Sequence, residues 1–299
     1  MKVAVVGAGR MGQLHLSALN KIRAEDNHVS EIGVFDILSD KAREAADKYS
    51  AVHLPSLDDV FSFKPDLTII ATPSASHYEL ASKLIDLSSL LVEKPVITKV
   101  EDGVALLNKS RETGHLVIPA HIERFNPLIE HLAKIEDLYH IDAKRLSRLN
   151  RDFSVYINVV FDLILHDIDA VIWATKPTTM TLRSINIEKE KFIVSSIVSL
   201  NIDNYITAVI HASWVSSVKM RQYNIIRNSG NSCTLDLLNN RTDCEGYEPK
   251  AIVDQLLMED RNAIGAVRGT EKPRTTIEDA IRDQRVIDAV LRGGGFIAI

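Results

Sequence analysis

The segment G-A-G-R-M-G at residues 7–12 has glycines at the spacing of a phosphate-binding loop. A strand-like run, Lys2–Val6, precedes it, and a stretch with apolar residues at helical spacing follows it. In that context Gly7 permits the tight turn, Gly9 lets the main chain approach a pyrophosphate, and Gly12 permits close packing of the helix on the strand. The helix N-terminus adds unpaired N–H groups and the positive end of the helix dipole. The segment predicts a dinucleotide site, although a glycine-rich turn can also serve steric needs alone.

Asp36 stands at the end of the second strand-like run, 24 residues after Gly12. An acidic residue about 20 residues beyond the glycines bonds the adenine ribose hydroxyls in such sites. Its carboxylate repels a 2′-phosphate, and residues 37 and 38 are Ile and Leu, so no arginine follows to hold one. We therefore expect NAD as cofactor in preference to NADP. The alternative is that Asp36 is a solvated residue at a strand end.

The elements that must position these residues follow an α/β pattern up to about residue 120. Short β-branched runs alternate there with amphipathic stretches, which predicts a doubly wound parallel Rossmann sheet. Capping boxes are expected at Ser76, Thr98 and Thr276, each followed three residues later by an acidic residue. The expected strands are Lys2–Val6, Glu31–Phe35, Leu67–Ala71, Leu90–Val92 and Leu116–Ile118.

After residue 120 strand-like runs follow one another, which predicts antiparallel pairing. We expect residues 1–120 to form the dinucleotide-binding domain, and residues 121–299 to form an α/β substrate-binding domain with a largely antiparallel open sheet. Helices are expected near Pro127, at Val159–Ala174, at Val253–Val267 and at Ile277–Leu291. These helices leave one sheet face uncovered, so a homodimer or homotetramer is expected.

Composition narrows the class of partner. The 299 residues are 45% hydrophobic and 25% charged with a net charge of -5 and no long block of one sign, so neither nucleic acid nor a membrane surface is expected. There is no signal-peptide cleavage region and no apolar run of the roughly 20 residues that a membrane span needs. Two cysteines, Cys233 and Cys244, are too few for a disulfide framework and lack the spacing of a metal site. We expect a cytoplasmic protein in a reducing compartment, with a small-molecule partner and no metal.

Three further segments resemble the glucose-fructose oxidoreductase and inositol dehydrogenase (Gfo/Idh/MocA) superfamily. They are A-T-P at 71–73 with His77, E-K-P at 93–95, and D-L-I-L-H-D-I-D at 162–169. The resemblance implies that the first segment passes beside the nicotinamide and that Lys94 lies at the mouth of a cleft. His77 could instead be a cap or loop contact. The expected cofactor-binding residues are Gly7, Gly9, Arg10, Met11, Gly12, Asp36, Thr72, Pro73, His77, Glu93 and Lys94.

The segment I-E-R-F-N-P at 122–127 is most similar to the branch of UDP-N-acetylglucosamine 3-dehydrogenases. Arg124, Asn126 and Arg151 are the expected substrate-binding residues, because guanidinium groups pair well with phosphate oxygens. Arg151 could equally be an ordinary surface arginine. The sequence departs from the superfamily at 156–160, where Y-I-N-V-V replaces the usual glycines and changes the residues expected to line the substrate pocket.

The resemblance implies Lys94, Asp162 and His166 as catalytic residues. Hydride transfer from an alcohol requires a base on the hydroxyl and a donor for the developing charge. Asp162 and His166 are four residues apart and share a helix face. Either His166 or Lys94 could be the acid/base, and a buried Asp–His pair with a purely structural role is the alternative.

These features predict an NAD-dependent oxidoreductase acting on a secondary hydroxyl or carbonyl of a sugar, polyol or nucleotide sugar. Two other functions stay open. One is reduction of a non-sugar carbonyl or pyrrole-type substrate, since a scaffold does not fix its reaction. The other is a regulatory protein that binds NAD without turnover.

Overall fold

The computed structural model describes residues 1–26, 28–149, 157–248 and 253–298. The chain divides into two compact units, one of residues 1–122 and 254–281 and the other of residues 123–253 and 282–299. This division differs from the expected single boundary at residue 120, because residues 254–281 return to the first unit. None of the helices in the described ranges combines the length and the apolar character that crossing a bilayer takes.

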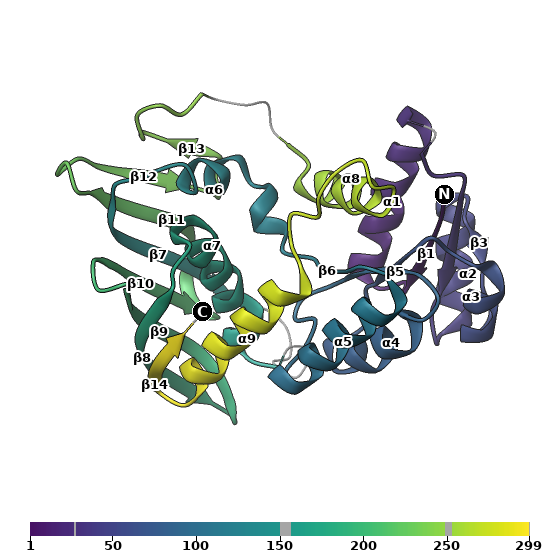
Figure 1. Ribbon diagram of the computed structural model, residues 1–299, viewed down its shortest axis with the longest axis horizontal. Coiled ribbons are helices and arrows are strands. Elements are labelled where there is room, and N and C mark those ends of the chain that lie inside the picture. Colours follow the sequence, from purple (N-terminus) through teal and green to yellow (C-terminus); the bar gives the residue numbers. More distant parts are fainter. Residues whose placement is uncertain (27, 150–156, 249–252, 299) are drawn as a thin grey trace. The chain divides into compact units, whose positions relative to one another are not determined.

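The first unit is built on a six-stranded parallel sheet, as expected (Figure 1). Its order, β3-β2-β1-β4-β5-β6, is that of a dinucleotide-binding fold, in which ligands bind at the carboxyl ends of the strands. The strands are β1 (Lys2–Val6), β2 (Glu31–Phe35), β3 (Val52–His53), β4 (Leu67–Ile70), β5 (Ser89–Val92) and β6 (Val117–Pro119). The two-residue strand β3 was not predicted, because so short a run carries no periodic signal.

Helices cover both faces of this sheet, which explains why its strands are buried on both sides. The helices α1 (Arg10–Asp26), α2 (Ser39–Tyr49) and α8 (Gln255–Val267) pack on one face. The helices α3 (Leu57–Phe63), α4 (His77–Leu84) and α5 (Val100–Thr113) pack on the other, together with residues 277–281. Figure 1 shows α8 lying alongside α1, although the two helices are more than 200 residues apart in the chain.

The predicted capping boxes at Ser76 and Thr98 do not form, whereas the main-chain N–H of Thr276 donates to the Asp279 carboxylate at 2.9 Å as predicted. At Ser76 the hydroxyl donates to the carbonyl oxygen of Pro73 at 2.8 Å instead of capping α4. Helix α5 begins one residue later than Thr98 predicted, with Lys99 as an N-cap that makes no side-chain hydrogen bond. A complete capping box forms at Ser56, at the start of α3. Serine and threonine bond equally well to nearby turns, so spacing alone does not identify a cap.

The second unit contains an eight-stranded, mostly antiparallel sheet of order β13-β12-β11-β7-β10-β9-β8-β14, in which only β7 and β10 among the described pairs run parallel. This confirms the expected largely antiparallel sheet. The strands are β7 (Leu138–Arg148), β8 (Thr179–Lys189), β9 (Phe192–Ile202), β10 (Ile206–Ser213), β11 (Val215–Arg227), β12 (Ser232–Asp236), β13 (Arg241–Thr242) and β14 (Gly294–Ala298).

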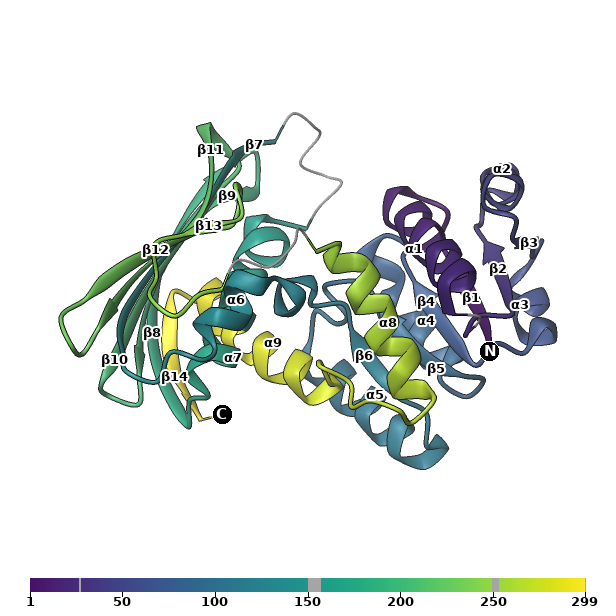
Figure 2. The ribbon, with the colours of Figure 1, turned by 90° about the horizontal axis from the view of Figure 1, so that it is seen from above.

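One face of this sheet carries the hydrophobic core of the unit. Helices α6 (Pro127–Leu132), α7 (Leu165–Thr175) and the second half of α9 (Ile277–Leu291) pack there, together with the π-helical turn η4 (Val160–Ile164). Figure 2 shows these helices on the concave side of the curved sheet. The predicted continuous helix from Val159 therefore begins with a π-helical turn, a feature that often marks functional sites.

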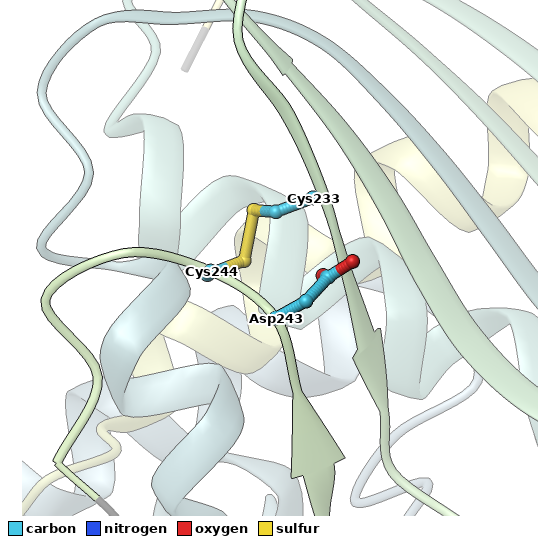
Figure 3. A group of neighbouring side chains, drawn as sticks. All are labelled: Cys233, Asp243 and Cys244. Carbon is cyan, nitrogen blue, oxygen red and sulfur yellow. A yellow bond between two sulfur atoms is a disulfide. The ribbon is translucent and has the colours of Figure 1, made fainter.

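The two cysteines are joined, contrary to the expectation of free thiols in a reducing compartment. Cys233 in β12 and Cys244 after β13 form a disulfide, with their Cα atoms 4.9 Å apart (Figure 3). The pairing of β12 with β13 brings them together, which their spacing in sequence did not reveal. Asp243 lies beside them, and its carboxylate accepts a hydrogen bond from the main chain of Thr234 at 2.6 Å. The bonded sulfurs are not thiolates and so are not metal ligands in this form.

Candidate active site

The glycine loop follows β1 and leads into α1. Gly7 has φ +105°, and a Cβ there would lie 2.7 Å from the main chain of Ala71. A Cβ on Gly12 would lie 1.8 Å from the carbonyl oxygen of Gly7. At Gly9, by contrast, a Cβ would meet no atom within 4 Å, and the residue is exposed. The fold itself therefore requires two of the glycines, whereas the space at Gly9 is left for a ligand that approaches the main chain.

Asp36, at the end of β2, reaches this loop directly. Its Oδ2 accepts from the main-chain N–H of Ala8 at 2.7 Å, and its Oδ1 accepts from that of Leu38 at 2.8 Å. The carboxylate oxygens keep further lone pairs that ribose hydroxyls could use. Ile37 is 90% exposed and Leu38 is 53% exposed, so an uncharged surface adjoins the carboxylate. This arrangement fits an adenosine without a 2′-phosphate.

The loop after β4 is tied to the turn after β5 by a buried histidine. The Nδ1 atom of His77 lies 2.9 Å from the carbonyl oxygen of Pro95, and its Nε2 atom lies 2.8 Å from that of Thr72. The exposed fraction of His77 is 1%. These contacts hold two loops together, which is the loop contact given above as the alternative for His77.

Lys94 is the exception within a buried segment. Between Ser88 and Ile97 every residue except Lys94 is buried. Its main-chain N–H donates to Oε2 of Glu93 at 3.2 Å, and the bond to Pro95 is cis. The E-K-P turn therefore presents one basic side chain at the carboxyl edge of the sheet, the same edge that carries the glycine loop.

Glu93 itself is buried and ionised. Burial alone would raise the pKa of its carboxyl, but the hydrogen bond and charge of His15 and the charges of Lys94 and His77 hold that pKa below its usual value. The ring of His15 lies 3.3 Å from Oε1 of Glu93. The sequence indicated that Glu93 lies near the cofactor, but it did not indicate His15 as the hydrogen-bond partner of this residue.

In the second unit, Asp162 and His166 are the partly exposed ionisable residues of an otherwise buried helical segment. From Val159 to Ile172 only these two and Leu163 are not fully buried. Residues four apart share a helix face, so both side chains are presented together. The Asn158 side chain caps the segment by accepting from the main-chain N–H groups of residues 160 and 161.

Trp214, just after β10, was missed by the sequence analysis. Its indole N–H donates to Oδ2 of Asp162 at 3.0 Å, and its exposed fraction is 1%. A buried indole N–H needs an acceptor, so a tryptophan on a strand is a weak sequence signal for such a contact. Nothing in the sequence indicated that Asp162 would be that acceptor.

The structure places two of the expected substrate-binding residues, Arg124 and Asn126, in the interior of the second unit. The Arg124 guanidinium is 2% exposed and forms a two-pronged pair with Asp169, with Nε 3.0 Å from Oδ2. Asn126 caps α6 by accepting from the N–H of Leu128 at 3.0 Å. Arg151 lies outside the described residues. The contacts of Arg124 and Asn126 are therefore structural ones.

A second buried ion-pair network supports the same helix. Arg145 of β7 forms a two-pronged pair with Asp167 of α7 and also contacts Glu123 at 3.2 Å. Tyr223 donates to Asp167 at 2.6 Å, and burial together with the charge of Asp167 raises the pKa of its phenol well above the usual value. Arg221 pairs with Glu123 as well. These bonds fix α7, and hence its exposed face, onto the sheet.

The chain is similar in sequence to known oxidoreductases. Residues 1–121 match the model of the oxidoreductase family with an NAD-binding Rossmann fold. The chain is 27% identical over 191 residues to UDP-N-acetylglucosamine 3-dehydrogenase of Acidithiobacillus ferrooxidans, which covers 62% of this chain and 58% of that protein. It is 26% identical over 186 residues to inositol 2-dehydrogenase of Corynebacterium glutamicum, which covers 58% and 53%. The matched part thus spans about half the length of these curated relatives.

Solved structures show that the likeness in fold extends over both units. A structure of the Acidithiobacillus ferrooxidans enzyme has a TM-score of 0.89 with 23% identity, covering 98% of this chain and 97% of that one. The WlbA dehydrogenase of Bordetella pertussis, crystallised with NADH and UDP-GlcNAcA, has a TM-score of 0.86 with 16% identity over 100% and 97%. The resemblance seen in the motifs is confirmed, since residues 1–121 match the model of the oxidoreductase family with an NAD-binding Rossmann fold.

Proposed function

We propose that this protein is an NAD-dependent dehydrogenase that acts on a secondary hydroxyl or carbonyl of a sugar, polyol or nucleotide sugar. The observation that carries the proposal is the exposure pattern of the ionisable residues. Lys94 in one unit, and Asp162 and His166 in the other, stay accessible within segments that are otherwise buried. Keeping polar groups accessible where their neighbours are buried is expected of residues that meet a substrate. The names of the relatives, among them a nucleotide-sugar and an inositol dehydrogenase, support the same substrate class.

In this proposal each residue has a defined task. Bound NAD supplies the acceptor for the hydride, and its pyrophosphate and ribose would be held by the loop at Gly9 and by Asp36. His166 or Lys94 takes the proton of the substrate hydroxyl in oxidation and returns it in reduction. The other of these two residues, in its protonated form, stabilises the charge that develops on the substrate oxygen. Asp162, fixed by Trp214, orients the substrate hydroxyl or the imidazole.

The test is a substrate panel. The protein is incubated with NAD and, separately, with UDP-sugars, free sugars and inositols, while the absorbance of reduced cofactor is followed. Turnover of at least one hydroxyl substrate, and its loss in Lys94→Met, is the expected result. Binding of NAD without turnover of any compound would instead identify a regulatory NAD-binding protein. Turnover of non-sugar carbonyls alone would show that the substrates are non-sugar carbonyls and not sugars or polyols.

We further propose that the protein is a homo-oligomer assembled through the outer face of the eight-stranded sheet. Apolar side chains stand exposed on neighbouring strands of that face, with exposed fractions of 67% for Ile185, 54% for Ile187 and 37% for Ile197. Burying such a patch against a second copy would remove apolar surface from water. Light scattering should give a dimer or tetramer, and Ile185→Asp should dissociate it. A wild-type monomer at all concentrations would exclude this assembly.

We also propose a cytoplasmic location, where NAD and sugar substrates are available. Disulfides are rare in that reducing compartment, so the state of Cys233 and Cys244 provides the test. Trapping free thiols in intact cells before lysis should label both residues. A fully formed bridge in cells would point to an oxidising compartment instead.

A further inference from the structure

A buried histidine in the first unit bridges two acidic residues from different elements. His15 of α1 has an exposed fraction of 0%. Its Nδ1 lies 2.8 Å from Oδ1 of Asp260 in α8, and its Nε2 lies 3.3 Å from Oε1 of Glu93 after β5. Ionised carboxylates only accept hydrogen bonds, so holding both requires two N–H groups on the ring. The geometry is that of an imidazolium between two carboxylates.

The charges around the ring favour this state. Burial lowers the pKa of His15, but the charges and hydrogen bonds of Asp260 and Glu93 outweigh it and raise that pKa well above the usual value. Glu259, the neighbour of Asp260 on α8, is also buried, and burial together with the charge of Glu93 raises its pKa well above the usual value. Burial also raises the pKa of the Asp260 carboxyl, against the opposing charge and hydrogen bond of His15. The contacts of the ring run from Asp260 through His15 to Glu93.

A gain in the stability of the fold does not by itself explain why this buried ionic cluster is present. Removing charges from water carries a large desolvation cost, and buried ion pairs are often no more stabilising than well-packed apolar residues. A fixed position for one of the groups is the better-supported use of a buried ionic network. Its neighbours therefore show what it positions.

The bridge ends on the main chain of Lys94. Oε2 of Glu93 accepts from the Lys94 N–H at 3.2 Å, while its other oxygen faces His15. On the far side of the turn, His77 donates to the carbonyl oxygen of Pro95 at 2.9 Å. The backbone that carries Lys94 is therefore held from both sides by buried side chains.

The outermost member of the bridge comes from a distant part of the chain. Asp260 lies outside residues 1–121, which match the family model, yet α8 packs on α1 in the same unit. Helix α1 also carries Gly12 of the glycine loop in its first turn. The bridge consequently connects the phosphate-binding helix, the returning helix α8 and the turn that bears Lys94.

We propose that His15 and Asp260 are positioning residues for Lys94, acting through Glu93 on the main chain of the E-K-P turn. The inference rests on the proposed function for the role of Lys94 in proton transfer. The bridge itself can be tested without any substrate.

The first test measures hydrogen exchange of the Lys94 amide by mass spectrometry of short peptides. His15→Asn should speed exchange of that amide by about tenfold or more, because Glu93 loses the partner that holds it. Asp260→Asn should have a similar effect, because the ring of His15 then loses the carboxylate that favours an N–H group on both of its nitrogens. Glu259→Gln is the matched control, a neutral isostere one residue away on the same helix, and should leave the exchange unchanged. Equal exchange in Asp260→Asn and the wild type would overturn the proposal.

A pair of isosteric variants then locates the contact that matters. The side-chain amide of Gln can replace Nε2 of His15 and reach Glu93, whereas that of Asn replaces Nδ1 and reaches only Asp260. His15→Gln should therefore keep Lys94 amide exchange near the wild-type rate, while His15→Asn should not. Similar behaviour of both variants would reduce His15 to a packing residue. Should a His15 variant fail to fold, Asp260→Asn and Glu93→Gln decide the question.

Kinetics link the bridge to the reaction. Asp260→Asn should lower kcat by about tenfold and change the pH profile of kcat, with the Kd of NAD within about threefold of the wild type. Glu259→Gln should change neither. If the wild type turns over no substrate, the proposed function fails, and the exchange data still decide whether the bridge positions Lys94. A normal kcat and pH profile in Asp260→Asn would contradict the positioning role.

Discussion

The indole N–H of Trp214 donates to Oδ2 of Asp162 at 3.0 Å, and this bond fixes a partly exposed carboxylate on the helix that also presents His166. Trp214 comes from the end of β10, so the sheet of the second unit sets the direction of the acidic side chain. The contact with Trp214 therefore ties the orientation of this carboxylate to the sheet.

Trp214→Phe should lower kcat by about threefold to tenfold, because Asp162 loses its fixed orientation. It should also lower the free energy of unfolding by about 1–2 kcal/mol through the lost hydrogen bond and reduced packing. Steady-state kinetics and urea unfolding measure the two effects. Trp173→Phe, at the only other tryptophan of the chain, is the control and should leave kcat near the wild-type value. Equal effects of both substitutions on kcat would argue against the bond.

Lys94→Met and His166→Ala should each reduce turnover by a factor on the order of 100 or more, since each removes a group proposed for proton transfer. The Kd of NAD, measured by fluorescence titration, should change little. The residual activity of both variants is measured against pH. The variant that lacks the acid/base should lose one limb of the pH profile of kcat, and this identifies the residue. Wild-type rates in both variants would remove both residues from the mechanism.

Asp36→Ala should weaken NAD binding and narrow the preference for NAD over NADP. Two effects combine here, because the carboxylate also holds the main-chain N–H groups of Ala8 and Leu38. Asp36→Asn keeps an acceptor oxygen but removes the charge, so it should narrow the preference with a smaller loss of NAD affinity. Titrations with both reduced cofactors check this. Unchanged selectivity in both variants would refute the ribose role.

Gly9→Ala and Gly12→Ala separate ligand binding from folding. The methyl group of Gly12→Ala would lie 1.8 Å from a carbonyl oxygen, so this variant should unfold at a markedly lower temperature or fail to fold. Gly9→Ala meets nothing in the protein and should melt like the wild type while binding NAD more weakly. Normal NAD affinity in Gly9→Ala would place the pyrophosphate elsewhere.

The free energy of unfolding should decrease as pH rises, because His15 loses its proton. Its folded-state pKa is raised above the unfolded value of about 6.5, so its stabilising contribution is fully present below that value. The contribution declines as pH rises and is lost through the folded-state pKa, by up to about 1.4 kcal/mol per pH unit for one proton. Urea unfolding across this range should show the decline in the wild type and not in His15→Gln. A flat wild-type profile would contradict the raised pKa.

The sequence determined the architecture and the location of the motifs. Strands β1 and β2 and helix α9 have the predicted bounds, because glycines, β-branched runs and helical periodicity are local signals. The glycine loop and Asp36 were predicted from the same local signals, whereas Lys94, Asp162 and His166 were predicted from the resemblance of their segments to the superfamily. Capping boxes were less predictable, since a hydroxyl such as that of Ser76 can form a competing local bond.

Only the tertiary structure decided the partners of these residues. Arg124 and Asn126 looked like substrate ligands by type, but Asp169 and the start of α6 occupy them. The contacts of Asp162 with Trp214 and of His15 with Asp260 join residues 52 and 245 positions apart. No periodicity or spacing encodes such pairs, because they depend on which strands become neighbours and on the return of α8 to the first unit. The disulfide between Cys233 and Cys244 likewise follows from the pairing of β12 with β13.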